Sequence, residues 1–218
     1  MASAEVSFWL SRIQVNPPRR KRFFRYQLHQ LIWRAYPGLP AGSRQPFLFT
    51  LPGQQDHKGV YCLVQSQVKP DWPMATHQES DNCLVLKNNY EVKSIHFEVW
   101  SGDQFFFQLH ACPMKSISQG KDRRGRKMSV QDRIGIEEWL IRRAEQHGFL
   151  LLRHEFSKEK IMVRRKPDRH ARNLLLSACR FSGFLEVNNE KKFAETITGG
   201  IGKKKIFGFG MLMLSPAV

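Results

Sequence analysis

Alternating and helically spaced apolar residues divide this 218-residue chain into short elements. Alternation over residues 8–15 predicts a first strand. Apolar side chains at Phe24, Leu28, Leu31 and Ala35 have the spacing of a buried helical stripe and predict a helix over residues 23–36. Further strands are predicted at residues 47–51, 60–66 and 92–100. Strand, helix, strand, strand is the order in which a ferredoxin-like βαββαβ unit begins.

The second half shows a comparable succession. Residues 101–103 are the predicted hinge, and helical periodicity predicts a helix over residues 132–146. A shorter helix is predicted at residues 190–198. Strands are predicted at residues 105–111, 149–154, 161–163, 178–186 and 207–214, with the second and third of these paired as a hairpin. The expected fold is therefore α+β, with two tandem ferredoxin-like domains at residues 1–100 and 101–218.

The charge of the chain indicates what kind of partner it binds. The chain has 35 lysines and arginines against 19 acidic residues, for a net charge of +16. More than half of the basic residues lie in four short stretches, at residues 19–25, 121–127, 164–172 and 203–205. Such clustering favours a polyanion. A membrane surface would also attract this charge, but the sequence shows neither a lipidation motif nor a strongly amphipathic basic helix. Nucleic acid is the preferred partner.

Several other classes of protein are disfavoured. The chain has no apolar run of about 20 residues and no apolar signal-like start, so a cytoplasmic protein without membrane contact is expected. No P-loop, G-x-S-x-G or metal-binding histidine motif is present, and no metal, cofactor or small-molecule substrate is expected. The cysteines are irregularly spaced and are predicted to be reduced and buried: Cys62, Cys83, Cys112 and Cys179.

The C-terminal segment 199–211 reads GGIGKKKIFGFGM and combines five glycines with three lysines. Glycine lets a backbone approach a ligand where a Cβ atom would clash, and successive amides can hold phosphate oxygens. We therefore expect this segment to contact RNA phosphates through Gly200, Gly202, Lys203, Lys204 and Lys205.

Tyr26 and His29 are three residues apart on the first predicted helix and share a face, which Arg22 and Trp33 extend. This face differs from the apolar stripe, so the pair is not required for the core. RNA cleavage needs a proton taken from the 2′-hydroxyl, charge stabilised at phosphorus, and a proton given to the leaving 5′-oxygen. A histidine, a tyrosine and nearby cations can supply all three. From spacing alone, a purely structural histidine is the favoured alternative.

Taken together, these segments resemble the CasE family, the CRISPR-associated endoribonucleases that process repeat RNA for the Cascade surveillance complex. The resemblance extends over nearly the whole chain. The residues that carry it are 8–12 (FWLSR), 26–33 (YQLHQLIW), 36–37 (YP), 46–49 (PFLF), 64–66 (VQS), 70–72 (PDW), 139–140 (WL), 148–149 (GF) and 199–214.

The resemblance implies two ferredoxin-like domains and metal-independent cleavage at the 3′ base of a repeat hairpin. In the family the 2′-hydroxyl attacks the neighbouring phosphate and leaves a cyclic phosphate. The family's catalytic histidine corresponds to His29, as general base or acid, and its tyrosine to Tyr26. The implied partners are CRISPR repeat RNA and, after cleavage, mature crRNA with the other Cascade subunits.

Further cations are expected to contact this RNA. They are Arg22, Arg25, Arg34, Lys121, Arg123, Arg124, Arg126, Lys127, Arg164 and Arg165. One departure from the family lies at residues 109–113 (LHACP), where His110 and Cys112 replace the usual arginine and asparagine. Two rival functions remain open, a non-catalytic subunit that binds an RNA hairpin and a general ribosomal or tRNA-binding protein.

Overall fold

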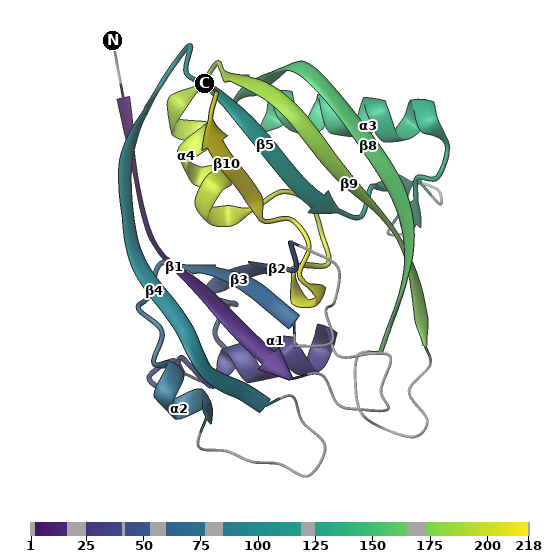
Figure 1. Cartoon of the computed structure of the whole chain (residues 1–218). Coiled ribbons are helices and arrows are strands. Elements are labelled where there is room, and N and C mark those ends of the chain that lie inside the picture. The colour runs from purple at the N-terminus through teal and green to yellow at the C-terminus, as the bar shows by residue number, and fades with distance from the viewer. Residues whose placement is uncertain are drawn as a thin grey trace.

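The computed structural model describes residues 3–16, 25–40, 42–52, 60–76, 85–118, 125–164 and 173–217, with only the backbone at 85–88. Two four-stranded antiparallel sheets form the molecule, one from each half of the chain (Figure 1). No helix in the described part of the chain is long and apolar enough to span a membrane.

The first sheet has the strand order β2-β3-β1-β4. Its elements are β1 (Ser3–Asn16), α1 (Arg25–Trp33), β2 (Phe47–Thr50), β3 (Val60–Ser66), α2 (Trp72–Thr76) and β4 (Val85–Trp100). This is the ferredoxin-like βαββαβ topology, as predicted. Helix α1 closes one face of the sheet because Leu28, Leu31 and Ile32 pack into one apolar cluster with Ile13 and Phe49.

The second sheet has the order β10-β5-β9-β8. Its elements are β5 (Gln104–Ala111), β6 (Met114–Ile117), β7 (Arg126–Ser129), α3 (Arg133–Gln146), β8 (Phe149–Val163), β9 (Leu174–Val187), α4 (Glu190–Gly199) and β10 (Leu212–Pro216). The same topology recurs here, with the β6–β7 hairpin inserted between the first strand and the first helix. The fold class expected from the sequence is confirmed.

Apolar packing crosses from one half to the other. Val6 of β1 and Val99 of β4 belong to the same buried cluster as Phe107, Trp139 and Phe193 of the second half. Helix α4 lies between the two sheets and contacts β1 and β4 (Figure 1). The halves therefore share a core, and the division into domains 1–100 and 101–218 stays a prediction.

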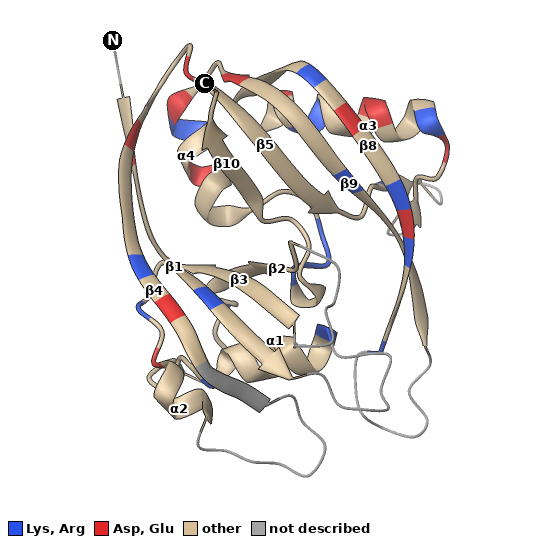
Figure 2. Cartoon of the chain, viewed as in Figure 1, with Lys and Arg blue, Asp and Glu red and all other residues tan. Residues whose placement is uncertain are grey.

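The predicted hairpin of residues 149–154 with 161–163 is wrong. β8 is one continuous strand that pairs with β9 from Phe149 to Val163, with a register shift between Leu151 and Arg153. Charged residues of both signs follow one another along it (Figure 2). These polar positions stay in the strand because most of them are solvent-exposed while the backbone remains paired.

Smaller differences concern where elements end. α1 ends at Trp33 instead of residue 36, and three successive residues then turn through bonds to carbonyls three positions back. The predicted strand 207–214 begins too early. A short 3₁₀ helix, η1 (Lys205–Phe207), precedes β10, because Gly208 and Gly210 have φ of 78° and 89° and interrupt an extended backbone. Helix α2 was not predicted, and the strands β6 and β7 pair within the region that the sequence pattern indicated as a basic loop and the family resemblance as a hairpin.

Candidate functional site

Residues 199–211, the Gly-rich segment, connect α4 to β10 and contact the first half of the chain (Figure 1). The amide of Ile201 donates to the Gly210 carbonyl at 2.7 Å, and the Gly210 amide donates to the backbone carbonyl of His110 on β5 at 2.8 Å. Helix α1 packs against η1 within this segment. The segment is thus a fixed part of the fold that touches elements from both sheets.

Two glycines make this contact possible. Gly200 has φ 71°, and a Cβ atom there would lie 2.9 Å from Leu48 Cδ1 on β2. Gly208 has φ 78°, and its Cβ would lie 2.7 Å from Phe49 Cε2 on the same strand. Side chains at either position would both strain the backbone and separate the segment from β2. The sequence predicts close approach to a ligand, but at these positions the close approach is to the protein itself.

Tyr26 on α1 contacts the Gly-rich segment, and His29 stacks on Tyr26. The two rings stack with centroids 5.8 Å apart, and Tyr26 lies 6.5 Å from the Phe207 ring of η1. His29 also packs against Phe47 and Phe49 at 5.5 and 6.5 Å. Only 9% of His29 is exposed, so this face of α1 is buried here although it lies apart from the apolar stripe.

The hydrogen bonds of His29 both involve Nε2. Gln45 Oε1 lies 3.1 Å from this atom, and Trp33 Nε1 donates to it at 3.2 Å. Gln45 is held in this orientation because its amide nitrogen donates to the Phe47 carbonyl at 2.6 Å. The carbonyl of Gln45 requires a proton on Nε2, whereas the Trp33 indole requires a lone pair there. The two partners therefore favour opposite tautomers.

The other ring nitrogen, Nδ1, is buried and has no hydrogen-bond partner among the described residues. Burial lowers the pKa of His29 below 6.5, and the hydrogen bond to Gln45 opposes this only partly. The imidazole is therefore neutral near pH 7 and can accept a proton there.

Arg25 joins α1 to the Gly-rich segment. Its guanidinium donates to the Phe207 carbonyl at 2.8 Å and lies over the Phe209 ring, 5.1 Å from the centroid. Burial lowers the pKa of Arg25 to about 10, although the carboxylate of Glu159 opposes the shift. These contacts are internal, so the structure gives Arg25 a docking role, and its predicted contact with RNA stays a prediction.

The described ends of the four basic stretches lie near one another. An apolar cluster around Phe207 and Phe209 includes Val163, which directly precedes Arg164, and Cys112, which lies just before β6. Tyr26 packs against the same cluster, one residue after Arg25. Figure 2 shows basic residues from both halves of the chain around this region. The described ends of all four stretches therefore surround the Gly-rich segment.

The remaining predicted RNA contacts differ in exposure. Arg126 and Lys127 on β7 and Lys203 are exposed, whereas Arg34, Arg164, Lys204 and Lys205 are half-buried. The ammonium of Lys205 donates to the Gly199 carbonyl, and burial lowers its pKa. Arg34 lies in the turn after α1. Other predicted contacts lie outside the described residues: Arg22, Lys121, Arg123, Arg124 and Arg165.

His110 and Cys112, the two residues that differ from the family pattern, have buried side chains. His110 is 3% exposed, pairs with the Glu159 carboxylate, and meets the Phe209 ring edge-on at 4.6 Å. Arg180 Nε lies 3.3 Å from the same carboxylate. Burial lowers the pKa of His110 in spite of this carboxylate. Cys112 is also buried, and burial raises the pKa of its thiol to about 12.

Sequence reasoning missed Gln45 and Glu159. Gln45 is a single glutamine in a loop, and Glu159 is one of several charged residues on β8, so neither stands out from its neighbours. Free, buried thiols are found at Cys62, Cys112 and Cys179, as predicted, while Cys83 lies outside the described residues. In the described part of the chain, no three potential metal ligands lie together.

Comparison with known proteins identifies the family. A family model described as "CRISPR associated protein" matches residues 8–216. The CRISPR-associated endoribonuclease Cse3 of Thermus thermophilus is 27% identical over 225 residues, which cover 95% of this chain and 100% of Cse3. The CRISPR system Cascade subunit CasE of Escherichia coli is 27% identical over 198 residues, or 88% of this chain and 92% of CasE.

A solved structure shares the fold. Thermus thermophilus Cse3, bound to an RNA representing a pre-cleavage complex, superimposes with a TM-score of 0.77 at 24% identity. The match covers 96% of this chain and 100% of the Cse3 chain. The two tandem units described above are therefore the arrangement found in this solved relative.

Proposed function

This chain belongs to the CRISPR-associated protein family in which Cse3 and CasE are its relatives, and we propose that it is a cytoplasmic endoribonuclease of the CasE type. Its substrate is the stem-loop of CRISPR repeat RNA. It cuts at the 3′ base of the stem and stays bound to the mature crRNA as a subunit of Cascade.

One observation carries this proposal. Tyr26, which stacks on His29, contacts the Gly-rich segment, near which the described ends of the four basic stretches lie. Cations from both halves can hold the RNA backbone there, while an imidazole that is neutral near pH 7 is available for proton transfer.

The reaction needs no group beyond these side chains. His29 accepts the 2′-hydroxyl proton, and the 2′-oxygen attacks the adjacent phosphorus. The bond from phosphorus to the 5′-oxygen breaks, the imidazolium of His29 gives the proton to that oxygen, and the products are a 2′,3′-cyclic phosphate and a 5′-hydroxyl. Tyr26 orients the reacting groups, and nearby cations stabilise the negative charge on phosphorus.

A second function is favoured by a specific observation. Nε2 of His29 has two internal partners and the ring is largely buried, which also suits a structural histidine in a non-catalytic subunit that binds an RNA hairpin. For catalysis, RNA binding must open access to the ring.

One experiment separates the two functions. The purified protein is incubated with its repeat RNA in excess EDTA, and the ends of the products are identified. Cleavage at one site with a cyclic phosphate end is expected. Tight binding without cleavage would support the non-catalytic subunit, and cleavage that requires added magnesium would contradict the metal-independent mechanism.

A further inference from the structure

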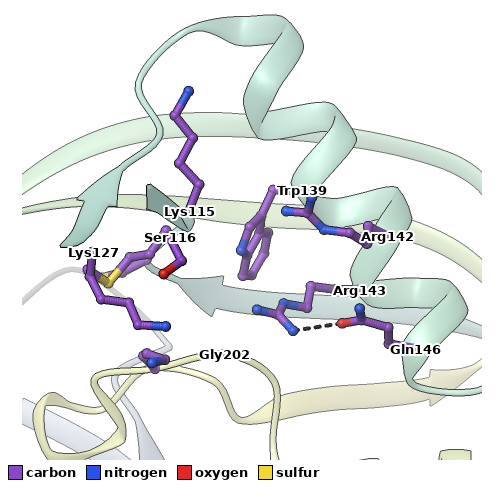
Figure 3. A pocket seen from close by; sticks show the side chains of 11 residues that line it. Lys115, Ser116, Lys127, Trp139, Arg142, Arg143, Gln146 and Gly202 are labelled. Carbon is purple, nitrogen blue, oxygen red and sulfur yellow. Dashed lines mark hydrogen bonds between the residues drawn. The ribbon is translucent and has the colours of Figure 1, made fainter. Parts of the chain in front are cut away.

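A pocket of about 310 Å³ lies on the second half of the molecule (Figure 3). Its walls are the β6–β7 hairpin, helix α3 and the start of the Gly-rich segment. Gly202 lines the pocket, and Phe207, five residues later in the same segment, contacts Tyr26. The pocket and the candidate catalytic pair are therefore connected by one short stretch of backbone.

The lining is strongly cationic. Five basic side chains contribute to it: Lys115, Lys127, Arg142, Arg143 and Lys203. No carboxylate is among the described residues that line it. Lys127 and Arg143 extend toward one another from opposite walls (Figure 3). Because these charges repel each other, an anion bound between them would be stabilised.

One wall of the pocket is a fixed, planar cation. The Trp139 ring is 1% exposed and stacks on Phe181 at 5.9 Å. The Arg143 guanidinium lies over the same ring, 5.6 Å from its centroid, and donates to Gln146 Oε1 at 2.7 Å. Its Nε atom is buried and has no hydrogen-bond partner among the described residues. A guanidinium held in this way offers a stacking surface at little entropic cost.

We propose that this pocket binds one unpaired nucleotide of the repeat RNA, an inference that rests on the proposed function. The base stacks on Arg143, and the phosphate of the nucleotide lies against Lys127 and Lys203. Unpaired bases can leave a helix and stack on arginine planes, whereas paired bases cannot enter a pocket of this size. The volume and the combination of a planar cation with ammonium groups fit a nucleotide better than a bare phosphate.

The test measures how protein variants and RNA changes couple. Repeat RNAs in which each unpaired nucleotide in turn is made abasic are titrated against the wild-type protein and Arg143→Gln. At one position, the wild type should lose about 5- to 100-fold in affinity, as expected for one stacked base. In Arg143→Gln the same abasic change should lower RNA affinity by less than about 2-fold.

A matched control is Arg133→Gln, on the same helix with the same loss of charge. The Arg133 side chain is 82% exposed and does not line the pocket. This variant should keep the full sensitivity to the abasic position. A second variant, Lys127→Gln, tests the phosphate on a different element. A neutral methylphosphonate at the same nucleotide should lower the RNA affinity of the wild type but should lower that of Lys127→Gln little further.

The outcomes separate this inference from the proposed function. If removing a base lowers the affinity of the wild type and of Arg143→Gln equally at every unpaired position, the proposal that the pocket binds a nucleotide is wrong, even if the repeat RNA is bound and cut. Failure of the wild type to bind the repeat hairpin overturns both. If Arg143→Gln does not fold, as judged by circular dichroism, the proposal is tested by Lys127→Gln instead. A methylphosphonate that weakens binding equally in the wild type and in Lys127→Gln would then contradict it.

Discussion

Helices α1 and α3 occupy the same place in the two βαββαβ units and both touch the Gly-rich segment, yet they present different chemistry to it. α1 presents Tyr26 against Phe207, with the largely buried His29 stacked on Tyr26. α3 presents Trp139 and Arg143 beside Gly202, in an open cationic pocket. The comparison teaches that topology positions both helices, whereas the side chains on one face suit the first to the proposed proton transfer and the second to the proposed RNA binding.

Removing the imidazole tests the α1 side and should have the largest effect. His29→Ala should lower the single-turnover cleavage rate by about 10²- to 10⁴-fold, because the proton-accepting group is lost. Hairpin affinity should change by less than about 2-fold. The control His96→Ala removes an exposed imidazole from β4 and should cleave normally. Wild-type rates in His29→Ala would remove His29 from the mechanism.

Separating the Gly-rich segment from the first sheet should have the next largest effect. Gly208→Ala places a Cβ atom 2.7 Å from Phe49 at a residue with φ 78° and should destabilise the fold by about 2–3 kcal/mol. Chemical denaturation measures this change. Gly199→Ala is the matched control, since no atom beyond its chain neighbours and its own helix backbone lies within 4 Å of its Cβ position. Equal stability of the two variants would show that the contact with β2 is not tight.

Removing positive charge from the β6–β7 hairpin tests the RNA binding proposed for the region next to α3. Arg126→Gln with Lys127→Gln should weaken hairpin binding and reduce the slope of log affinity against log salt by about 1 to 2, because fewer counterions are released. Cleavage of saturated RNA should be affected much less than binding. The control pair is Lys191→Gln with Lys192→Gln on α4, where both residues are exposed. An unchanged slope in the β7 variant would show that the hairpin faces away from RNA.

The smallest expected effect concerns pH. Burial lowers the pKa of His29, His110 and His147 in the folded protein. Below about pH 6.5 the unfolded chain therefore binds more protons than the folded one, so stability should fall as pH decreases from 7 to 5. His29 should contribute less than about 1.4 kcal/mol per pH unit. Denaturation at several pH values should show a shallower dependence in His29→Ala than in His96→Ala. Identical dependences would mean that His29 is not desolvated.

The fold could be predicted from sequence because its signals are local. The helical stripe of α1 agrees with the burial of Leu28 and Leu31, and the short apolar run of β3 is largely buried. Asp132 caps α3 by accepting from the Gly135 amide at 2.7 Å. The centre of β8 could not be predicted, because its polar residues have no strand-like alternation and remain extended only through pairing with β9.

Sequence by itself determined the topology of the two units, the excess of positive charge and the pairing of Tyr26 with His29 on one helical face, since each depends on composition or short-range spacing. Only the tertiary structure decided what these residues touch. It placed His29 between Gln45 and Trp33, turned Arg25 inward onto Phe209, and directed the glycines against β2. These contacts join residues far apart in the chain, and local patterns carry no information about which distant surfaces will meet.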